Sequence, residues 1–250
     1  MSVMTGAARK GIRFTSSVID FAVIVAVLLL IAIGFYAMWD SNQVFQRADP
    51  SRYGSWKPTD ENAGLSFMEL QALNPDVFAW LTVYETNIDY PVVQCREGNN
   101  MTYISTNVLG EYSMSGAIFL DVKNCSSFSD FNSMIHGHHM DKEVMFGQLE
   151  FFAQEDYFNE RPYGTLYFDG REHTVEFFAF IQADAYDAHI YRLALEDDEE
   201  RQEYLDMLLD IALYTRDIPV TIDDNIILLN TCSSFSTNGR DLLVGRVLRT

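Results

Sequence analysis

The sequence predicts a mainly β domain, a barrel or sandwich with added helices, that follows one N-terminal transmembrane helix. Near the N-terminus, 19 consecutive residues carry no charge. Beyond residue 65, short runs rich in β-branched and aromatic residues alternate with Asn, Asp and Gly, as in all-β proteins. The composition, 48% hydrophobic and 21% charged with only 14 Gly and 6 Pro in 250 residues, excludes collagen-like, low-complexity and wholly disordered chains.

The uncharged stretch, residues 21–39, reads FAVIVAVLLLIAIGFYAMW. At 1.5 Å per residue, a helix of this length crosses a hydrocarbon core of about 30 Å. A core helix of a soluble protein would carry a polar face, and a cleaved signal peptide would have a shorter apolar region that ends at small residues. We therefore predict an uncleaved transmembrane anchor over residues 18–39.

Charge predicts how the anchor is oriented. The bases that precede it are Arg9, Lys10 and Arg13. The positive-inside rule then places residues 1–17 in the cytoplasm and the rest outside, as in a single-pass protein of the cell membrane. The whole chain has 36 acidic and 17 basic residues, a formal charge of -19. This charge would repel phosphate backbones, so we expect no nucleic-acid partner.

Residues 40–64 are polar, contain three Pro or Gly residues before position 60 and show no sustained period, which predicts an extracellular stalk. A short helix is expected over residues 65–73, ended by Asn74 and Pro75. Two more helices are expected, one over residues 144–152 and one after the acidic run 196–200. Acidic residues at a helix N-terminus complement the helix macrodipole. We prefer this interpretation to a calcium site, because the side chains of consecutive acidic residues at the start of a helix point in different directions.

Eight runs beyond residue 76 have the composition of strands, and Asn, Asp and Gly separate them. Such spacing is typical of a β-barrel or sandwich. The predicted strands cover residues 77–84, 88–93, 116–121, 133–137, 165–168, 174–183, 225–231 and 242–248.

The three cysteines differ in their surroundings. Cys232 ends the apolar run 226–229 and precedes a polar loop, where a thiol nucleophile is open to substrate. A buried structural role is the alternative, since most cysteines pack as small apolar residues. Cys95 and Cys125 have no obvious catalytic partners, and a disulfide between them stays open because the sequence does not give their distance.

Three of the five histidines cluster at His136, His138 and His139. If the preceding strand continued, alternation would place His136 and His138 on one face and His139 on the other. Their spacing differs from the His-x-His-x-Asp-His arrangement of metallo-hydrolases, so we expect no metal. A cysteine nucleophile with a distant histidine, which protonates a leaving amine, is the better interpretation.

Arg240 lies eight residues after Cys232, across the turn sequence Ser-Thr-Asn-Gly. A hairpin of this length can return the guanidinium toward the sulfur, where it would stabilise an oxyanion and a thiolate. An isolated solvated arginine is the alternative.

These motifs together resemble the sortases, the membrane-anchored transpeptidases of Gram-positive cell surfaces. The resemblance rests on Ile-His-Gly-His-His-Met at 135–140, Leu-Leu-Asn-Thr-Cys at 228–232 and Arg240. Residues 74–81, 88–94, 116–121 and 145–149, and the long helix before the cysteine, resemble class B sortases. The resemblance covers residues 65–250.

Three departures from the family pattern accompany the resemblance. The family commonly has Tyr-Gly-His-Asn-Met where this chain has His136-Gly137-His138-His139-Met140, so His138 matches the catalytic position. Leu228 stands where the family motif usually begins with Thr, four residues before the nucleophile, whereas Thr231 and Cys232 are kept. The loop from Cys232 to Arg240 is short. The short loop leaves recognition of the substrate's leading residues open.

The resemblance implies a closed eight-stranded β-barrel with added helices and no metal or organic cofactor. It implies that Cys232 attacks a Thr carbonyl in the C-terminal sorting signal of a secreted protein, with His138 as proton donor and Arg240 as oxyanion stabiliser. The partners would be these surface proteins, the membrane and an amine of a lipid-linked peptidoglycan precursor. Three alternatives stay open: a pilin polymerase that uses a pilin Lys, a membrane-tethered cysteine peptidase, and a non-catalytic surface-binding module.

Overall fold

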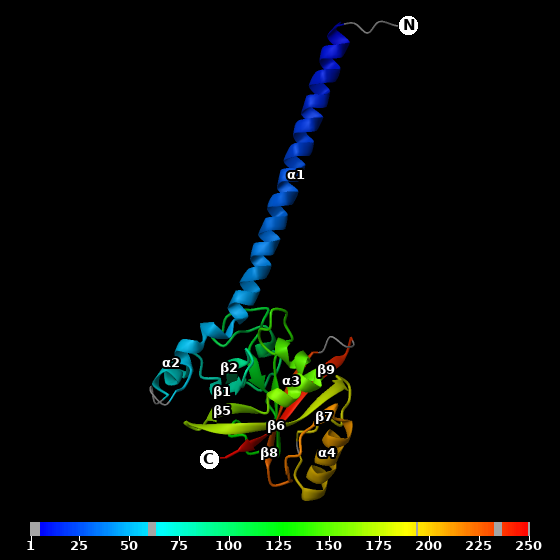
Figure 1. Cartoon of the computed structure of the whole chain (residues 1–250). Coiled ribbons are helices and arrows are strands. Elements are labelled where there is room, and N and C mark those ends of the chain that lie inside the picture. Colours follow the sequence, from blue (N-terminus) through cyan, green and yellow to red (C-terminus); the bar gives the residue numbers. More distant parts are fainter. Residues whose placement is uncertain (1–5, 60–63, 194, 233–236, 250) are drawn as a thin grey trace. The chain divides into compact units, whose positions relative to one another are not determined.

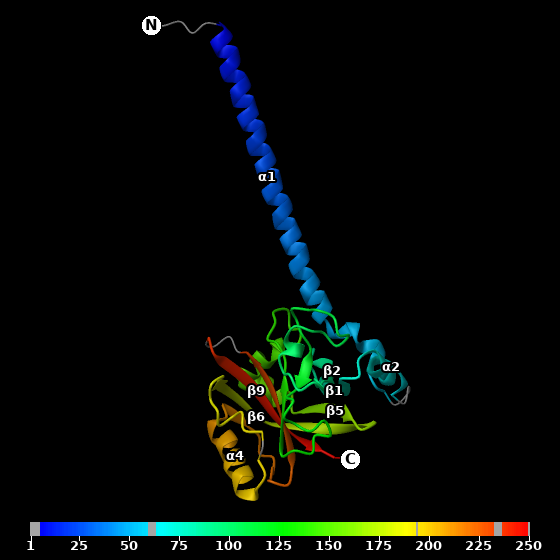
Figure 2. The ribbon, with the colours of Figure 1, turned by 180° about the vertical axis from the view of Figure 1, so that it is seen from behind.

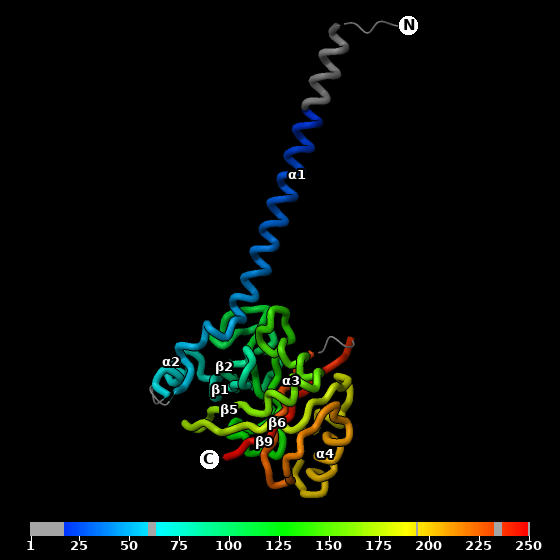
Figure 3. The backbone as a smooth tube through the Cα atoms, in the orientation of Figure 1, coloured from blue at the N-terminus to red at the C-terminus, as the bar shows by residue number. Residues whose placement is uncertain are grey.

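The computed structural model describes residues 6–59, 64–193, 195–232 and 237–249. The chain forms two compact units, Met1–Val44 and Phe45–Thr250. The first unit consists of most of helix α1 (Gly6–Ala48), whose apolar side chains from Val18 to Trp39 are exposed. By length and composition this helix is a candidate membrane span, which agrees with the predicted anchor (Figure 3). Its orientation across a membrane stays a prediction.

The polar stretch after the predicted span is more regular than the sequence indicates. Helix α1 continues to Ala48, and two short 3-10 helices follow, η1 (Pro50–Arg52) and η2 (Gly54–Trp56). Ala48 and Tyr53 are buried in the core of the second unit. Scattered apolar side chains therefore hold this stretch on the domain, although they show no period that would predict it. Residues 60–63 of the predicted stalk lie outside the described residues.

Among the described residues, eight strands of the second unit close into a barrel, as predicted (Figure 1). The order is β5-β1-β2-β3-β4-β8-β9-β6, and pairing of β5 with β6 closes the sheet. A ninth strand, β7, adds two residues at the edge of β6. The bounds are β1 Val77–Val83, β2 Asp89–Val93, β3 Ile118–Leu120, β4 Asn132–His136, β5 Tyr163–Phe168, β6 Arg171–Asp184, β7 Tyr214–Thr215, β8 Asn225–Cys232 and β9 Gly239–Leu248.

Strand β8 is buried on both faces, which explains its continuous apolar run. Ile227 and Leu229 point into the main core, whereas Ile226 and Leu228 pack in a second core that includes side chains of helix α4 (Asp198–Ile211). The helix predicted after the acidic run 196–200 forms, but it begins inside the run, at Asp198. The side-chain carboxylate of its N-cap residue, Asp197, accepts a hydrogen bond from the Glu200 N–H. Figures 1 and 2 show α4 and the short helix α2 (Leu65–Leu73) on opposite sides of the barrel.

Among the remaining helices, the structure differs from the prediction over residues 144–160. A helix was expected over residues 144–152, but Met145 has φ 54°, in the left-handed region, so no helix begins there. A 3-10 helix, η4 (Gly147–Ala153), starts two residues later, and a six-residue helix, α3 (Glu155–Glu160), follows. Helix α2 forms over the expected residues. A further 3-10 turn, η3 (Thr102–Ile104), lies before β3.

Candidate active site

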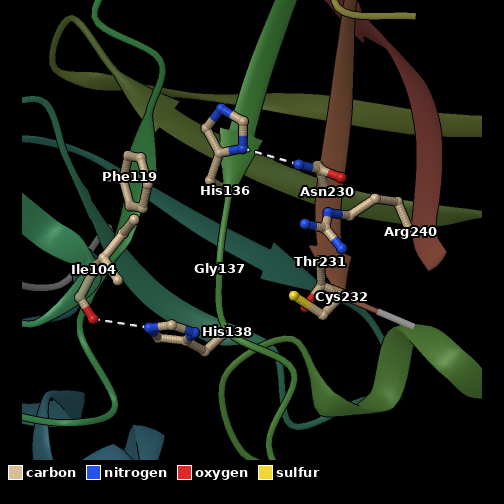
Figure 4. A pocket seen from close by; sticks show the side chains of 9 residues that line it. All are labelled: Ile104, Phe119, His136, Gly137, His138, Asn230, Thr231, Cys232 and Arg240. Carbon is tan, nitrogen blue, oxygen red and sulfur yellow. Dashed lines mark hydrogen bonds between the residues drawn. The ribbon is translucent and has the colours of Figure 1, made fainter. Parts of the chain in front are cut away.

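A pocket lies where β4, β8 and β9 end or begin, and it brings the three predicted site residues together (Figure 4). Cys232 is the last residue of β8, Arg240 is the second residue of β9, and His138 follows the end of β4. The lining consists of Ile104, Phe119, His136, Gly137, His138, Asn230, Thr231, Cys232 and Arg240. The arrangement agrees with a cysteine nucleophile beside a histidine and an arginine, whose roles stay predictions.

Backbone pairing fixes Cys232 opposite Arg240. The two residues are direct partners in the antiparallel ladder of β8 and β9, so their side chains share one face of the sheet. Cys232 is exposed and Arg240 half-buried, and the guanidinium lies beside Thr231 and Cys232 in the pocket (Figure 4). A thiol at this place is open to a substrate carbonyl, and the guanidinium offers planar donors next to it. Residues 233–236 of the connecting loop lie outside the described residues.

His138 is oriented by a backbone carbonyl. Its Nε2 lies 2.8 Å from the oxygen of Ile104, and because a carbonyl only accepts, Nε2 carries the hydrogen. The other ring nitrogen lies on the side of the ring toward Cys232 (Figure 4). This leaves Nδ1 to bind or release a proton on the pocket side, as a general acid–base requires.

Strand β4 begins and ends one residue earlier than predicted, so strand alternation does not decide the positions of the histidines that follow it. It ends at His136 rather than at residue 137, and Gly137 then passes between two side chains. A Cβ on Gly137 would lie 2.5 Å from Ile118 and 2.6 Å from Phe146. A side chain at position 137 would therefore require Ile118 and Phe146 to shift, so glycine lets these two side chains pack against the backbone just before His138.

His136 belongs to a polar network on the pocket wall. Its Nδ1 accepts a hydrogen bond of 2.9 Å from the Asn230 amide, and its Nε2 lies 3.3 Å from an Asp121 carboxylate oxygen. Its ring also lies on Phe119, with centroids 5.1 Å apart. Burial raises the pKa of Asp121, but the hydrogen bond from His136 and the Lys123 N–H outweigh it and the pKa is lowered. His136 therefore joins Asn230 of β8 to Asp121, the residue that follows β3.

Tyr191 is a residue near the site that the sequence did not single out. Burial raises its pKa; the charge of Arg240 lowers it and that of Cys232 raises it, so the phenol lies within electrostatic range of both. Its hydroxyl is buried and has no hydrogen-bond partner among the described residues. Tyr191 lies in the segment between β6 and α4, where no periodicity or motif marks it.

The positions of the other cysteines and histidines bear on the disulfide and on the metal site that the sequence raised as alternatives. All three cysteines are free, with Cys95 buried and Cys125 exposed, so the disulfide left open by the sequence does not form. His139 lies 3.9 Å from Glu150 and outside the pocket lining. No group of three or more His, Cys, Asp or Glu side chains is placed to hold a metal within the described part of the chain.

Several known proteins are similar to this chain in sequence and fold. No protein-family model matches the chain. It is similar to sortase B of Listeria monocytogenes, with 30% identity over 182 residues, 72% of this chain and 73% of the relative. Among solved structures, sortase B from the type II pilus of Streptococcus pneumoniae is 42% identical, with a TM-score of 0.63 over 73% of this chain and 98% of that one. Sortase B of Clostridium perfringens is 34% identical, with a TM-score of 0.69 over 73% of this chain and 100% of that one.

Proposed function

The chain belongs to the sortase B family, and we propose on that basis that it is a cysteine transpeptidase that attaches surface proteins to the cell wall. One observation carries the proposal: His138 lies more than ninety residues before Cys232 and Arg240 in the sequence, yet all three line the same pocket. A non-catalytic binding module would not require a thiol, an imidazole and a guanidinium to converge there.

The first step is acylation of the enzyme. The Cys232 sulfur attacks the carbonyl carbon of a Thr in the sorting signal, forming a C–S bond and an oxyanion that Arg240 stabilises. When the oxyanion collapses, the C–N bond breaks and His138 gives its proton to the departing amine. The products are a thioester on Cys232 and the free C-terminal peptide.

The second step releases the protein onto an acceptor. A primary amine attacks the thioester carbonyl and loses a proton to His138, and the C–S bond breaks to restore the thiolate. We assign this amine to a peptidoglycan precursor. No step requires a metal or an organic cofactor. An anchor with residues 1–17 in the cytoplasm would hold the pocket outside, where secreted substrates and a lipid-linked amine are both present.

Pilin polymerisation is the second candidate, and one observation favours it: the 42% identical structure is a sortase B from a type II pilus. In that reaction the acceptor is a Lys side chain of another pilin subunit. A membrane-tethered cysteine peptidase, in which water resolves the thioester, differs only in the second step.

Mass spectrometry of the trapped acyl-enzyme tests the proposal. The full chain in detergent is incubated with peptides from candidate surface proteins, and a mass increase is expected on the proteolytic fragment that contains Cys232. A soluble peptidoglycan-type amine should then shift the product from free acid to amide. If the product stays the free acid with every amine, the chain is a peptidase. If the acyl group is transferred only to a pilin Lys, the chain is a pilin polymerase. Absence of any adduct on Cys232 would contradict all three.

A further inference from the structure

The turn that follows His138 holds a conformation that side chains disfavour. Lys142, Glu143 and Met145 have φ values of 60°, 60° and 54°. In this left-handed region the Cβ of an L-residue crowds the following carbonyl, so such residues persist only where the surroundings hold them. Three of them within four positions indicate that the turn, residues 142–145, is held by groups outside it.

The hydroxyl of Tyr90 is one of those groups. It accepts a hydrogen bond of 2.8 Å from the Met145 N–H and donates one of 2.8 Å to the carbonyl of Ala48. Tyr90 is 1% exposed, and burial raises its pKa, so the hydroxyl keeps the proton that it donates. One buried hydroxyl thus joins the turn to the last residue of helix α1.

A second contact joins the same two segments. The ammonium group of Lys142 lies 4.4 Å from the centre of the Phe45 ring, within the range of a cation–π interaction. Phe45 and Ala48 occupy the last turn of α1 and belong to the same compact unit as the barrel. Both ends of the strained turn are therefore held by the segment that connects the anchor to the domain.

The turn in turn holds His138. The Phe146 N–H, next to Met145, donates to the carbonyl of His138 at 3.0 Å, and His139 pairs with Met145 in an isolated β-bridge. The Phe146 ring also lies 2.6 Å from where a Cβ on Gly137 would be, so it packs against the backbone just before His138. The contacts run without a break from Ala48 through Tyr90, Met145 and Phe146 to His138.

We propose that Tyr90 is a positioning residue for His138. In this proposal, the last turn of α1 holds Tyr90 in place, and Tyr90 in turn holds the turn 142–145 that supports the histidine. The proposal rests on the proposed role of His138 as the proton donor. The segment between the membrane anchor and the barrel is then a support of the active site and not only a tether. A change in that segment is expected to alter the step that needs the His138 proton more than peptide binding.

The test uses the full chain in detergent micelles with Tyr90→Phe, which removes the hydroxyl and keeps the ring. Tyr214→Phe is the matched control, because the Tyr214 hydroxyl also donates to a backbone carbonyl, but to that of Ala153 at 3.2 Å and not to a partner of the turn 142–145. Side-chain ¹⁵N resonances of His138, assigned by their loss in His138→Gln, report its position without any substrate. Tyr90→Phe should shift them, and Tyr214→Phe should not.

Kinetics give the second readout. Tyr90→Phe should lower kcat for an amide sorting peptide by about tenfold or more, with KM nearly unchanged, because small displacements of a catalytic group are costly. A thioester version of the peptide, whose thiolate leaves without a proton, should be cleaved at close to the parental rate. Equal losses with both substrates would indicate a general disturbance and overturn the proposal.

Phe45→Leu provides a second variant, which keeps an apolar side chain and removes the ring under Lys142. It should shift the same His138 resonances, so the test does not depend on whether Tyr90→Phe folds. Unchanged His138 resonances in both variants would overturn the positioning role, whatever the enzyme cleaves. If the resonances shift but the parent chain acylates no sorting peptide, the positioning role stands and the proposed function fails.

Discussion

Cys232 and Arg240 are direct partners across the ladder of β8 and β9, so the backbone itself sets the relation between thiol and guanidinium. Directly opposed residues in such a ladder have Cβ atoms about 5 Å apart and share a face. The register is unbroken over eight residue pairs, from Asn225 opposite Val247 to Cys232 opposite Arg240, and the middle of this ladder is buried on both faces. The pairing of two packed strands of the barrel thereby determines the geometry of the site.

The first prediction concerns the nucleophile. Cys232→Ala should abolish acylation and cleavage of a sorting peptide, because only a thiolate forms the thioester. Its thermal unfolding should stay close to that of the parent, since Cys232 is exposed. Cys125→Ala, at another exposed thiol, is the matched control and should retain activity, as should Cys95→Ala. Cleavage by Cys232→Ala at the parental rate would show that another group is the nucleophile.

The second prediction concerns the general acid. His138→Ala should lower kcat about 10²–10⁴-fold, the usual contribution of a positioned acid–base, as measured by peptide cleavage at saturating substrate. His139→Ala should lose far less, because His139 lies outside the pocket lining beside Glu150. A chelator should leave the parent's rate unchanged. Inhibition that Zn²⁺ reverses would contradict the acid–base role and support a metal.

Much of the barrel could be predicted because each of its strands carries its own local signal. Residues 226–229 are all apolar because both faces of this strand are buried, and such a short apolar run predicts a buried strand. Strand β7 has only two residues and α3 only six, too few for a period to show. The 3-10 helix η4 was predicted as a longer helix because the left-handed backbone at Met145 leaves no mark in the sequence.

The candidate site also has residues that the sequence could predict and residues that it could not. Cys232, His138 and Arg240 were predictable because each lies in a motif whose residue types fit one reaction. The Ile104 carbonyl that orients His138, and the buried Tyr191 hydroxyl within electrostatic range of Arg240 and Cys232, were not predictable. Backbone carbonyls have no sequence signature, and no motif or period marks Tyr191 in the β6–α4 connection. Supports of a catalytic group are therefore harder to predict than the group itself.

The third prediction concerns the pH dependence of stability. The folded pKa of Asp121 is lowered below its unfolded value of about 3.9, so its contribution is complete above that pH and is lost as the pH falls through the folded pKa. Asp121→Asn should therefore unfold at lower temperature than the parent at pH 7, and the difference should shrink below about pH 4. Asp210→Asn, exposed on α4, is the control and should follow the parent. A difference that does not change with pH would mean that Asp121 stabilises the fold without its charge.

The last prediction concerns Arg240. If its guanidinium stabilises the oxyanion, the planar fork of donors matters and not only the charge. Arg240→Lys should then resemble Arg240→Ala, with kcat lower by about 10²–10³ as for other lost oxyanion donors. Arg246, six residues along β9, bonds Glu176 at 2.7 Å, so Arg246→Ala should reduce thermal stability yet leave kcat nearly unchanged at a temperature where it is folded. Equal losses of kcat at Arg240 and Arg246, or none in Arg240→Lys, would remove Arg240 from the site and leave backbone amides as the oxyanion donors.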